Sequence, residues 1–226
     1  MMSQKDGMPS EQASTTGSGV RAFTVLELMV VVAMLVLLVT VLLPELAPRR
    51  RDIARGHCFN NLKQIGIACR IWADDNNGLY PMEVYTNASG GPLFLGSNVF
   101  RYFQVMSNEL NTPKILVCPA DWERPTATNF ANDVGNNHVS YFLGLSCDQS
   151  RPQMLLSGDR NITNGTSLQN SVLTLGPDHQ AHWTKMIHNR NGNVGFTDGS
   201  VREVDDKQLN AVVAASGTNI NRLGMP

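Results

Sequence analysis

A long apolar run near the start of the chain, Phe23–Leu43, constrains the fold most strongly. As a helix, at about 1.5 Å per residue, it would be about 31 Å long, close to the thickness of the hydrocarbon core of a bilayer. Its only ionisable side chain is Glu27. A carboxylate inside an apolar helix costs on the order of 3 kcal/mol unless it finds a partner. The run therefore predicts a membrane-spanning helix in which Glu27 either reaches the headgroups or meets a positive charge from another copy of the chain.

The segments on either side of the run are polar. Residues 1–22 are rich in Ser, Gly, Thr and Gln, which predicts a disordered leader. An ordinary secretory signal is cut after its apolar region, whereas here the only small-residue junction, Val20-Arg21-Ala22, precedes it. Pro44 and Pro48 follow the run, and because proline removes a helical hydrogen bond we expect a kink or a short melted turn between residues 43 and 52.

An amphipathic helix is expected to follow over residues 52–75. One stripe of this helix carries apolar residues at spacings of three and four, namely Ala54, Cys58, Leu62, Ile65, Cys69 and Trp72. The polar sequence Asp74–Gly78 is predicted to end the helix, with Gly78 as the stop. This helix would carry a globular head on its apolar stripe.

The four cysteines, Cys58, Cys69, Cys118 and Cys147, form no CxxC pair, so a zinc knuckle is not indicated. Beyond a membrane disulfides become plausible. On one helix Cys58 and Cys69 would lie about 16 Å apart, whereas a disulfide needs Cα atoms within about 7 Å. This excludes a Cys58–Cys69 bridge and leaves two full pairings, a single bridge, or four buried thiols.

The rest of the chain, residues 76–226, predicts a loop-rich head with short strands. A hairpin is the clearest signal, because Asp198-Gly199 separates two β-rich runs and favours a type I′ turn with φ > 0 at both residues. The tail from Ser216 has little apolar content and is expected to fray. The segments Leu93–Leu95 and Val99–Phe103 suggest a short strand and a short helix, and further strands are expected at Lys114–Pro119, His138–Leu145 and Met154–Asn161.

The sequence RAFTVLELMVVVAMLVLLVTVLLP resembles the N-terminus of type IV pilins and type II secretion pseudopilins. The resemblance implies cleavage by a prepilin peptidase between Ala22 and Phe23, and N-methylation of the new Phe23 amine. It also implies that Glu27 pairs with the Phe23 amine of a neighbouring subunit. The family usually has Gly before the cut, where this chain has Ala22.

Two further segments extend the resemblance. The sequence CFNNLKQIGIACRIWADDNNGLYP is very similar to the second half of the long helix in pilin-like proteins of planctomycete and verrucomicrobial bacteria. His188, followed after nine residues by Asp198-Gly199, resembles the prepilin processing-associated head domain. The implied fold is α+β and pilin-like, with a long helix packed on a small antiparallel sheet. The expected parts are the leader 1–22, the membrane helix 23–43, its kinked amphipathic continuation 44–75 and the extracytoplasmic head 76–226.

Other kinds of site have weak signals. His179, His182 and His188, with Asp178 and Asp198, lie in a loop-like context, so no transition-metal site is predicted. His188 is expected to cap or hydrogen-bond the Asp198 hairpin. Because some pseudopilins hold calcium in C-terminal loops, Asp198, Asp205 and Asp206 are candidate calcium ligands; no other cofactor is expected. The chain lacks GxSxG and HExxH, and no enzyme activity is predicted. The pairs Asp121/Glu123 and Asp159/Arg160 are expected to form ion pairs or turn caps.

The function implied by the resemblance is that of a filament subunit in the inner membrane, with its head in the periplasm. Its expected partners are copies of itself, related pilin-like subunits, the prepilin peptidase, the inner-membrane assembly platform and the lipid bilayer. The net charge of −1 and the lack of a basic arm argue against nucleic acid. Arginines 49, 50, 51 and 55 follow the run, which by the positive-inside rule would put the head in the cytoplasm; the resemblance favours the opposite orientation. The alternative is a monomeric, membrane-anchored periplasmic binding or hydrolytic domain.

Overall fold

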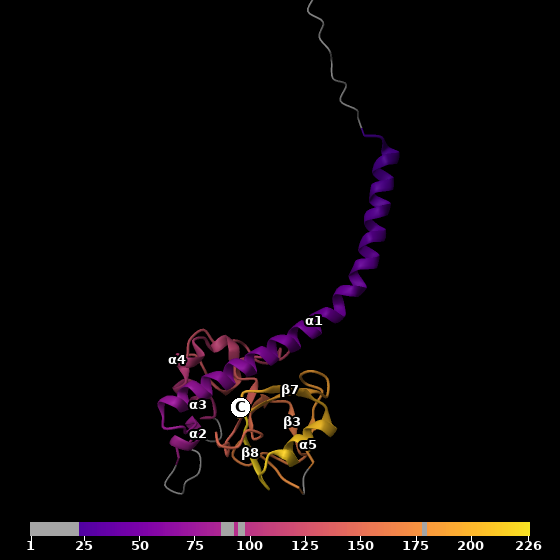
Figure 1. The fold of residues 1–226 in the computed structure, drawn as a ribbon. Coiled ribbons are helices and arrows are strands. Elements are labelled where there is room, and N and C mark those ends of the chain that lie inside the picture. Colours follow the sequence, from indigo (N-terminus) through magenta and orange to yellow (C-terminus); the bar gives the residue numbers. More distant parts are fainter. Residues whose placement is uncertain (1–22, 87–92, 95–97, 178–179) are drawn as a thin grey trace, which may run out of the picture. The chain divides into compact units, whose positions relative to one another are not determined.

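A computed structural model describes residues 23–86, 93–94, 98–177 and 180–226, with the backbone alone for residues 44–52. The chain divides into two compact units, Met1–Leu46 and Ala47–Pro226. One helix, α1 (Val25–Asp75), begins in the first unit and continues into the second (Figure 1). The predicted leader, residues 1–22, lies outside the described residues.

The backbone of α1 is helical without interruption through Pro44 and Pro48. The melted turn predicted between residues 43 and 52 is therefore wrong, since a proline costs the helix one hydrogen bond without unwinding the turns beside it. The kink stays a prediction. The predicted C-terminal stop is confirmed: Asn77 and Gly78 have φ values of 58° and 80°, and the Gly78 N–H donates to the carbonyl of Ala73 at 2.8 Å.

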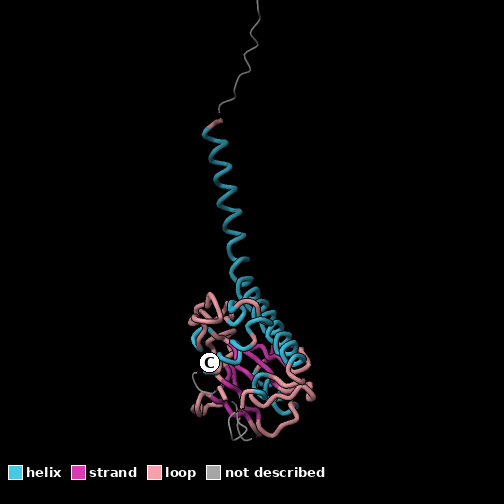
Figure 2. Tube along the Cα trace, turned by 90° about the vertical axis from the view of Figure 1, so that its left-hand side faces the viewer, coloured by secondary structure: helices cyan, strands magenta, loops and turns pink. Residues whose placement is uncertain are grey.

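The predicted apolar stripe of α1 is confirmed in the second unit. Cys58, Leu62, Ile65 and Cys69 are at most 1 % exposed, and Trp72 is buried. Ala54, the first member of the stripe, is only half-buried. The stripe packs into a core with residues of the sheet, and Figure 2 shows this part of α1 along one side of the strands.

A six-stranded antiparallel sheet lies at the centre of the second unit. In spatial order its strands are β4 (Val172–Leu175), β8 (Asn221–Gly224), β1 (Tyr141–Gly144), β2 (Leu155–Asp159), β6 (Gly192–Phe196) and β7 (Val201–Val204). A separate two-stranded sheet pairs β3 (Ile162–Thr163) with β5 (His182–Trp183). The combination of α1 with antiparallel strands confirms the α+β class.

The sheet is buried on both faces. Along β1, Tyr141 and Leu143 belong to the core under α1, whereas Phe142 between them belongs to a second core. Successive side chains of a strand point to opposite faces, so the two cores lie on opposite sides of the sheet. The second core is covered by α5 (Asp206–Ala215), a helix the sequence analysis did not predict, through Leu209 and Val213.

A helical segment separates α1 from the sheet in the sequence. It contains α2 (Pro81–Val84), α3 (Phe100–Val105), α4 (Ser107–Leu110) and two 3-10 helices, η2 (Pro113–Leu116) and η3 (Asn136–His138). The helix predicted at Val99–Phe103 is confirmed by α3, whereas the strand predicted at Leu93–Leu95 is wrong at Leu93 and Phe94, which form a bend, and Leu95 lies outside the described residues.

The strand predicted at Lys114–Pro119 is wrong, because that apolar sequence begins as η2. The Thr112 hydroxyl accepts a hydrogen bond from the Lys114 N–H at 3.4 Å, and Pro113 occupies the first position of the helix. A cap and a proline at this position favour a helical turn over a strand.

Other predicted strands are confirmed in shorter form. The segment His138–Leu145 contains β1, and Met154–Asn161 contains β2 followed by a turn. The predicted hairpin is confirmed as β6–β7, with Gly195 paired to Val201.

The turn of this hairpin differs from the predicted type I′ turn. Gly199 has a φ of 82°, whereas Asp198 is not among the described residues with positive φ. The Gly199 N–H donates to the carbonyl of Phe196 at 2.9 Å, and the Phe196 N–H donates to the carbonyl of Ser200 at 2.9 Å. This is a three-residue loop, in which one left-handed glycine after an ordinary turn is enough to reverse the chain.

The predicted fraying of the tail is wrong. Residues Asn221–Gly224 form β8, which lies between β4 and β1, and Leu223 and Met225 are buried in the second core. Four residues with one large apolar side chain give almost no signal in the sequence. They become a strand because two neighbouring strands supply hydrogen bonds on both edges.

Candidate functional site

The first candidate site is the exposed N-terminal half of α1. Val25–Leu43 is the one described helix long and apolar enough to cross a membrane, and none of it is buried. Large side chains along it, such as Leu26 and Leu37, are 74 % and 67 % exposed. A signal sequence near an N-terminus has the same composition, so length and composition alone fit either a membrane anchor or a signal sequence.

Glu27 has partners within its own chain. The Thr24 N–H and hydroxyl donate to Glu27 Oε2 at 2.9 and 3.0 Å, and the Glu27 N–H donates to Thr24 Oγ1 at 3.3 Å. This reciprocal arrangement is a capping box, which satisfies the free N–H groups at the start of a helix. The Thr-x-x-Glu spacing of this box is visible in the sequence, where headgroups or a positive charge from another copy were the predicted partners of Glu27. Phe23 is exposed next to the cap, and Ala22 lies outside the described residues.

The second candidate site lies in the head, where the four cysteines are divided into one bridge and two thiols. Cys58 on α1 and Cys118 after η2 form a disulfide with Cα atoms 5.1 Å apart. Cys69 and Cys147 are free and buried. Of the pairings that the sequence left open, the structure therefore has the single bridge. Burial raises the pKa of the Cys69 thiol to about 12 and that of Cys147 well above its usual value.

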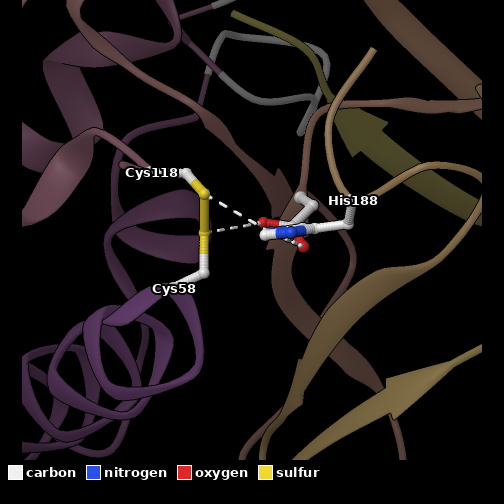
Figure 3. A group of neighbouring side chains, drawn as sticks. Cys58, Cys118 and His188 are labelled. Carbon is white, nitrogen blue, oxygen red and sulfur yellow. Dashed lines mark hydrogen bonds and ion pairs between the residues drawn. A yellow bond between two sulfur atoms is a disulfide. The ribbon is translucent and has the colours of Figure 1, made fainter. Parts of the chain in front are cut away.

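Two buried ionisable side chains contact this disulfide. His188 Nε2 lies 3.4 Å from Cys118 Sγ, and Asp159 Oδ1 lies 3.6 Å from Cys58 Sγ. His188 Nε2 and Asp159 Oδ2 are 3.5 Å apart. Figure 3 shows the His188 ring directed at the sulfur–sulfur bond. Burial raises the pKa of Asp159 to about 7, and burial and the nearby Arg55 lower that of His188 to about 4.

The loop that carries His188 is held in an unusual conformation. His188, Asn189 and Arg190 all have positive φ, at 49°, 51° and 65°, which costs non-glycine residues about 1 kcal/mol each. The Asn161 amide donates to three carbonyls of this loop region, those of Thr184, Ile187 and Asn191. These bonds hold His188 against the disulfide.

The prediction that His188 caps or hydrogen-bonds the Asp198 hairpin is wrong, because its side chain contacts Cys118 and Asp159. His188 precedes β6, whereas Asp198 and Gly199 follow it, and a strand of this length puts roughly 15 Å between its two ends. Asp198 instead accepts from the Ser200 N–H at 2.7 Å, and Arg70 of α1 donates to the Thr197 carbonyl at 2.8 Å. The His-x9-Asp-Gly motif therefore places one residue at each end of a strand.

The structure does not bring the candidate calcium ligands together. Asp205 caps α5 by accepting from the Gln208 N–H, Asp206 accepts from the Trp183 N–H, and Asp198 belongs to the hairpin turn. Among the histidine candidates, His182 is half-exposed and contacts Asp206, while Asp178 and His179 lie outside the described residues.

The predicted ion pairs are found, with a different pairing. Arg160 donates to both oxygens of Asp121 at 2.7 and 2.8 Å and to Glu123 at 2.8 Å. Asp159, next to Arg160 in the sequence, points to the disulfide instead, which fits the alternation of side chains near the end of β2. Asp159 is the member of the head site that sequence reasoning missed, because its partners come from three distant segments.

Comparison of the chain with protein-family models, with curated proteins and with solved structures found no match.

Proposed function

We propose that the chain is a structural subunit of a membrane-derived filament, of the kind formed by type IV pilins or type II secretion pseudopilins. The observation that carries this proposal is that the two halves of α1 have different surroundings. The half Val25–Leu43 exposes an apolar surface on every side, whereas the half from Cys58 to Ala73 is anchored in the core of the head. In a bilayer the first half contacts lipid, and in a filament it contacts the same helix of neighbouring subunits.

Processing completes the proposed subunit. A prepilin peptidase would cut between Ala22 and Phe23 and methylate the new Phe23 amine. The residues that remain keep both members of the capping box, Thr24 and Glu27. Only Oε2 of Glu27 takes part in that box, so Oε1 stays available for the Phe23 amine of an adjacent, staggered subunit. In a low-dielectric helix bundle such a pair sets the stagger between subunits.

The disulfide supports an extracytoplasmic head. Cys58 and Cys118 form a disulfide, and disulfides persist in oxidising compartments but are rare in the cytosol. This favours the periplasmic side for the head over the cytoplasmic side suggested by the arginines after the run. The filament heads would then face outward, where their loops meet related pilin-like subunits and the assembly platform.

The alternative function is a monomeric, membrane-anchored binding or hydrolytic domain. The contact between Cys118, His188 and Asp159 does not favour hydrolysis, because Cys118 is in the disulfide and both partners face the same ring nitrogen of His188. In a catalytic triad the acid holds the opposite nitrogen.

Intact-mass measurement of the chain extracted from membranes tests the proposal. A mature protein that starts at N-methylated Phe23, and that appears in sheared filaments under electron microscopy, is the expected result. A chain that keeps Met1 and stays monomeric in the membrane would instead support the anchored domain.

A further inference from the structure

Four metal-ligating side chains meet in the head from four separate segments of the chain. They are Cys58 on α1, Cys118 after η2, Asp159 at the end of β2 and His188 before β6, and their ligand atoms all lie within 4.8 Å of one another. No other group of three or more such side chains forms in the part of the chain that the structure describes. We propose that this group binds one zinc ion when the Cys58–Cys118 disulfide is reduced.

The distances fit a tetrahedral zinc site. Zinc binds thiolate at about 2.3 Å and imidazole or carboxylate at about 2.0–2.2 Å, so neighbouring ligand atoms of a tetrahedron lie roughly 3.3–3.8 Å apart. The observed separations are 3.4 Å between Cys118 Sγ and His188 Nε2, 3.6 Å between Cys58 Sγ and Asp159 Oδ1, and 3.5 Å between His188 Nε2 and Asp159 Oδ2. All four ligand atoms lie within 4.8 Å of one another, and the two sulfur atoms must move apart once their bond is broken. Two cysteines, one histidine and one carboxylate also form a ligand set that zinc accepts.

When Cys58 and Cys118 are bridged, the buried oxygen Asp159 Oδ1 faces a sulfur atom that has no hydrogen to donate. Asp159 is 0 % exposed, and the described hydrogen-bond contact of its Oδ1 atom is Cys58 Sγ. A disulfide sulfur carries no proton, so in the bridged state it donates nothing to this oxygen. A buried carboxylate oxygen without a donor is costly, and a bound cation removes that cost.

A second layer of hydrogen bonds already contacts three of the four ligand residues, Cys58, Asp159 and His188. Asp159 Oδ2 accepts from the backbone and side-chain N–H groups of Asn193 at 2.7 and 3.0 Å. The Tyr141 hydroxyl donates to Cys58 Sγ at 3.4 Å and accepts from the Asn61 amide at 3.2 Å. Arg55 donates to the His188 carbonyl at 3.3 Å and so places a positive charge beside the site. Two thiolates, one carboxylate and Zn²⁺ together carry one net negative charge, which this arginine offsets. Such outer partners fix ligand orientation in zinc proteins.

The cluster also has an approach from solvent. A pocket of about 500 Å³ is lined by His188 together with Ala54, Arg55, Pro119, Trp122 and Met186. The His188 side chain is only 2 % exposed, so an ion or a small reductant that enters this pocket reaches the ligands when the His188 loop moves aside.

The exchange between the two states balances with a dithiol reductant. The dithiol supplies two electrons that break the Cys58–Cys118 bond and is itself oxidised to a disulfide. Its two protons pass to solvent, because both cysteines bind zinc as thiolates. Oxidation of the zinc-bound cysteines by a disulfide reverses the step and releases the ion. The zinc site does not depend on assembly into a filament, although the oxidised form of the same cysteine pair supports the proposed location of the head.

Cobalt substitution tests the proposal on the full chain in detergent. The chain is reduced with a phosphine under anaerobic conditions, Co²⁺ is added, and the visible spectrum is recorded before and after competition with zinc. We expect a tetrahedral, thiolate-bound Co²⁺ spectrum with one ion per reduced chain, and no such spectrum for the oxidised chain. A reduced chain that yields only the spectrum of hydrated Co²⁺, or an oxidised chain that binds equally well, would overturn the proposal.

Two variants locate the ion. The His188→Gln change keeps the cysteines and should weaken zinc binding by at least about tenfold, with circular dichroism confirming the fold. The matched control, Cys69→Ala with Cys147→Ala, removes the two free thiols and should bind one ion as the natural chain does. Unchanged affinity in His188→Gln, or lost binding in the control while it remains folded, would place the ion elsewhere and contradict the site.

Discussion

Thr24 and Glu27 cap each other at the start of α1, with a Thr24 N–H to Glu27 Oε2 distance of 2.9 Å and a Glu27 N–H to Thr24 Oγ1 distance of 3.3 Å. Glu27 therefore has a role within one chain, besides its proposed role between subunits. The two roles are separable, because glutamine completes a capping box as well as glutamate does but carries no charge.

The first prediction uses this difference. Glu27→Gln should keep the helix, membrane insertion and cleavage but prevent ordered filaments, because only a carboxylate pairs with the Phe23 amine. Thr24→Ala should lose about 1 kcal/mol of capping at the first turn and still assemble. Electron microscopy of sheared filaments measures both. Normal filaments from Glu27→Gln would show that the residue serves only as a cap.

A second prediction concerns the ion pair between Asp121 and Arg160. The two side chains are 1 % and 10 % exposed, so removal of Asp121 leaves the buried Arg160 with the partly exposed Glu123 as its remaining acidic partner. Asp121→Ala should lower the free energy of unfolding by about 3–5 kcal/mol, measured by urea unfolding of the head in detergent. Asp148→Ala breaks the exposed pair with Arg151 and is the control, expected to change little. Equal effects would mean that burial does not decide the strength of these pairs.

A third prediction tests the last strand. Leu223→Ala should cost about 2–5 kcal/mol in urea unfolding, because Leu223 is 1 % exposed in the second core. Ile220→Ala, three residues earlier, should change stability by less than about 0.5 kcal/mol, because Ile220 is 54 % exposed. If Leu223→Ala behaves like Ile220→Ala, β8 does not hold the sheet together in solution.

The fourth prediction concerns the state of each cysteine. In the folded, non-reduced chain at pH 8, Cys69 and Cys147 should resist alkylation: both are buried, and their raised pKa values, about 12 for Cys69, keep them protonated rather than as reactive thiolates. Alkylation should rise only after unfolding. Peptide mapping without reduction should recover Cys58 linked to Cys118, and a link that includes Cys69 or Cys147 would contradict the structure.

The elements predicted well are those whose signal is local. The stripe from Cys58 to Trp72 repeats at the helical period, Gly78 supplies the left-handed stop, and Asp198-Gly199 marks a chain reversal between two β-rich runs. In each case the physical cause lies within a few neighbouring residues, so a single sequence contains it. The turn type was wrong because a second solution with one left-handed glycine satisfies the same pair of residues.

The head site could be predicted only in pieces. The sequence excluded a disulfide between Cys58 and Cys69, because the two residues lie too far apart on one helix. That Cys118 is the partner of Cys58 depends on the path of the chain through η2. His188 was singled out for a motif, yet it contacts Asp159 and the disulfide at the opposite end of β6 from Asp198. Nothing in the local sequence of Asp159 distinguishes it from an ordinary turn residue.

The amino-acid sequence by itself determined the long helix, its exposed apolar half and its buried stripe, because spacing along one helix decides which side chains share a face. Tertiary structure decided which cysteines are bridged, that Asn221–Gly224 is an inner strand, and that Asp159 meets His188. These outcomes depend on groups more than 25 residues apart that become neighbours only when the sheet assembles, and their energies come from burial and pairing that no local segment contains.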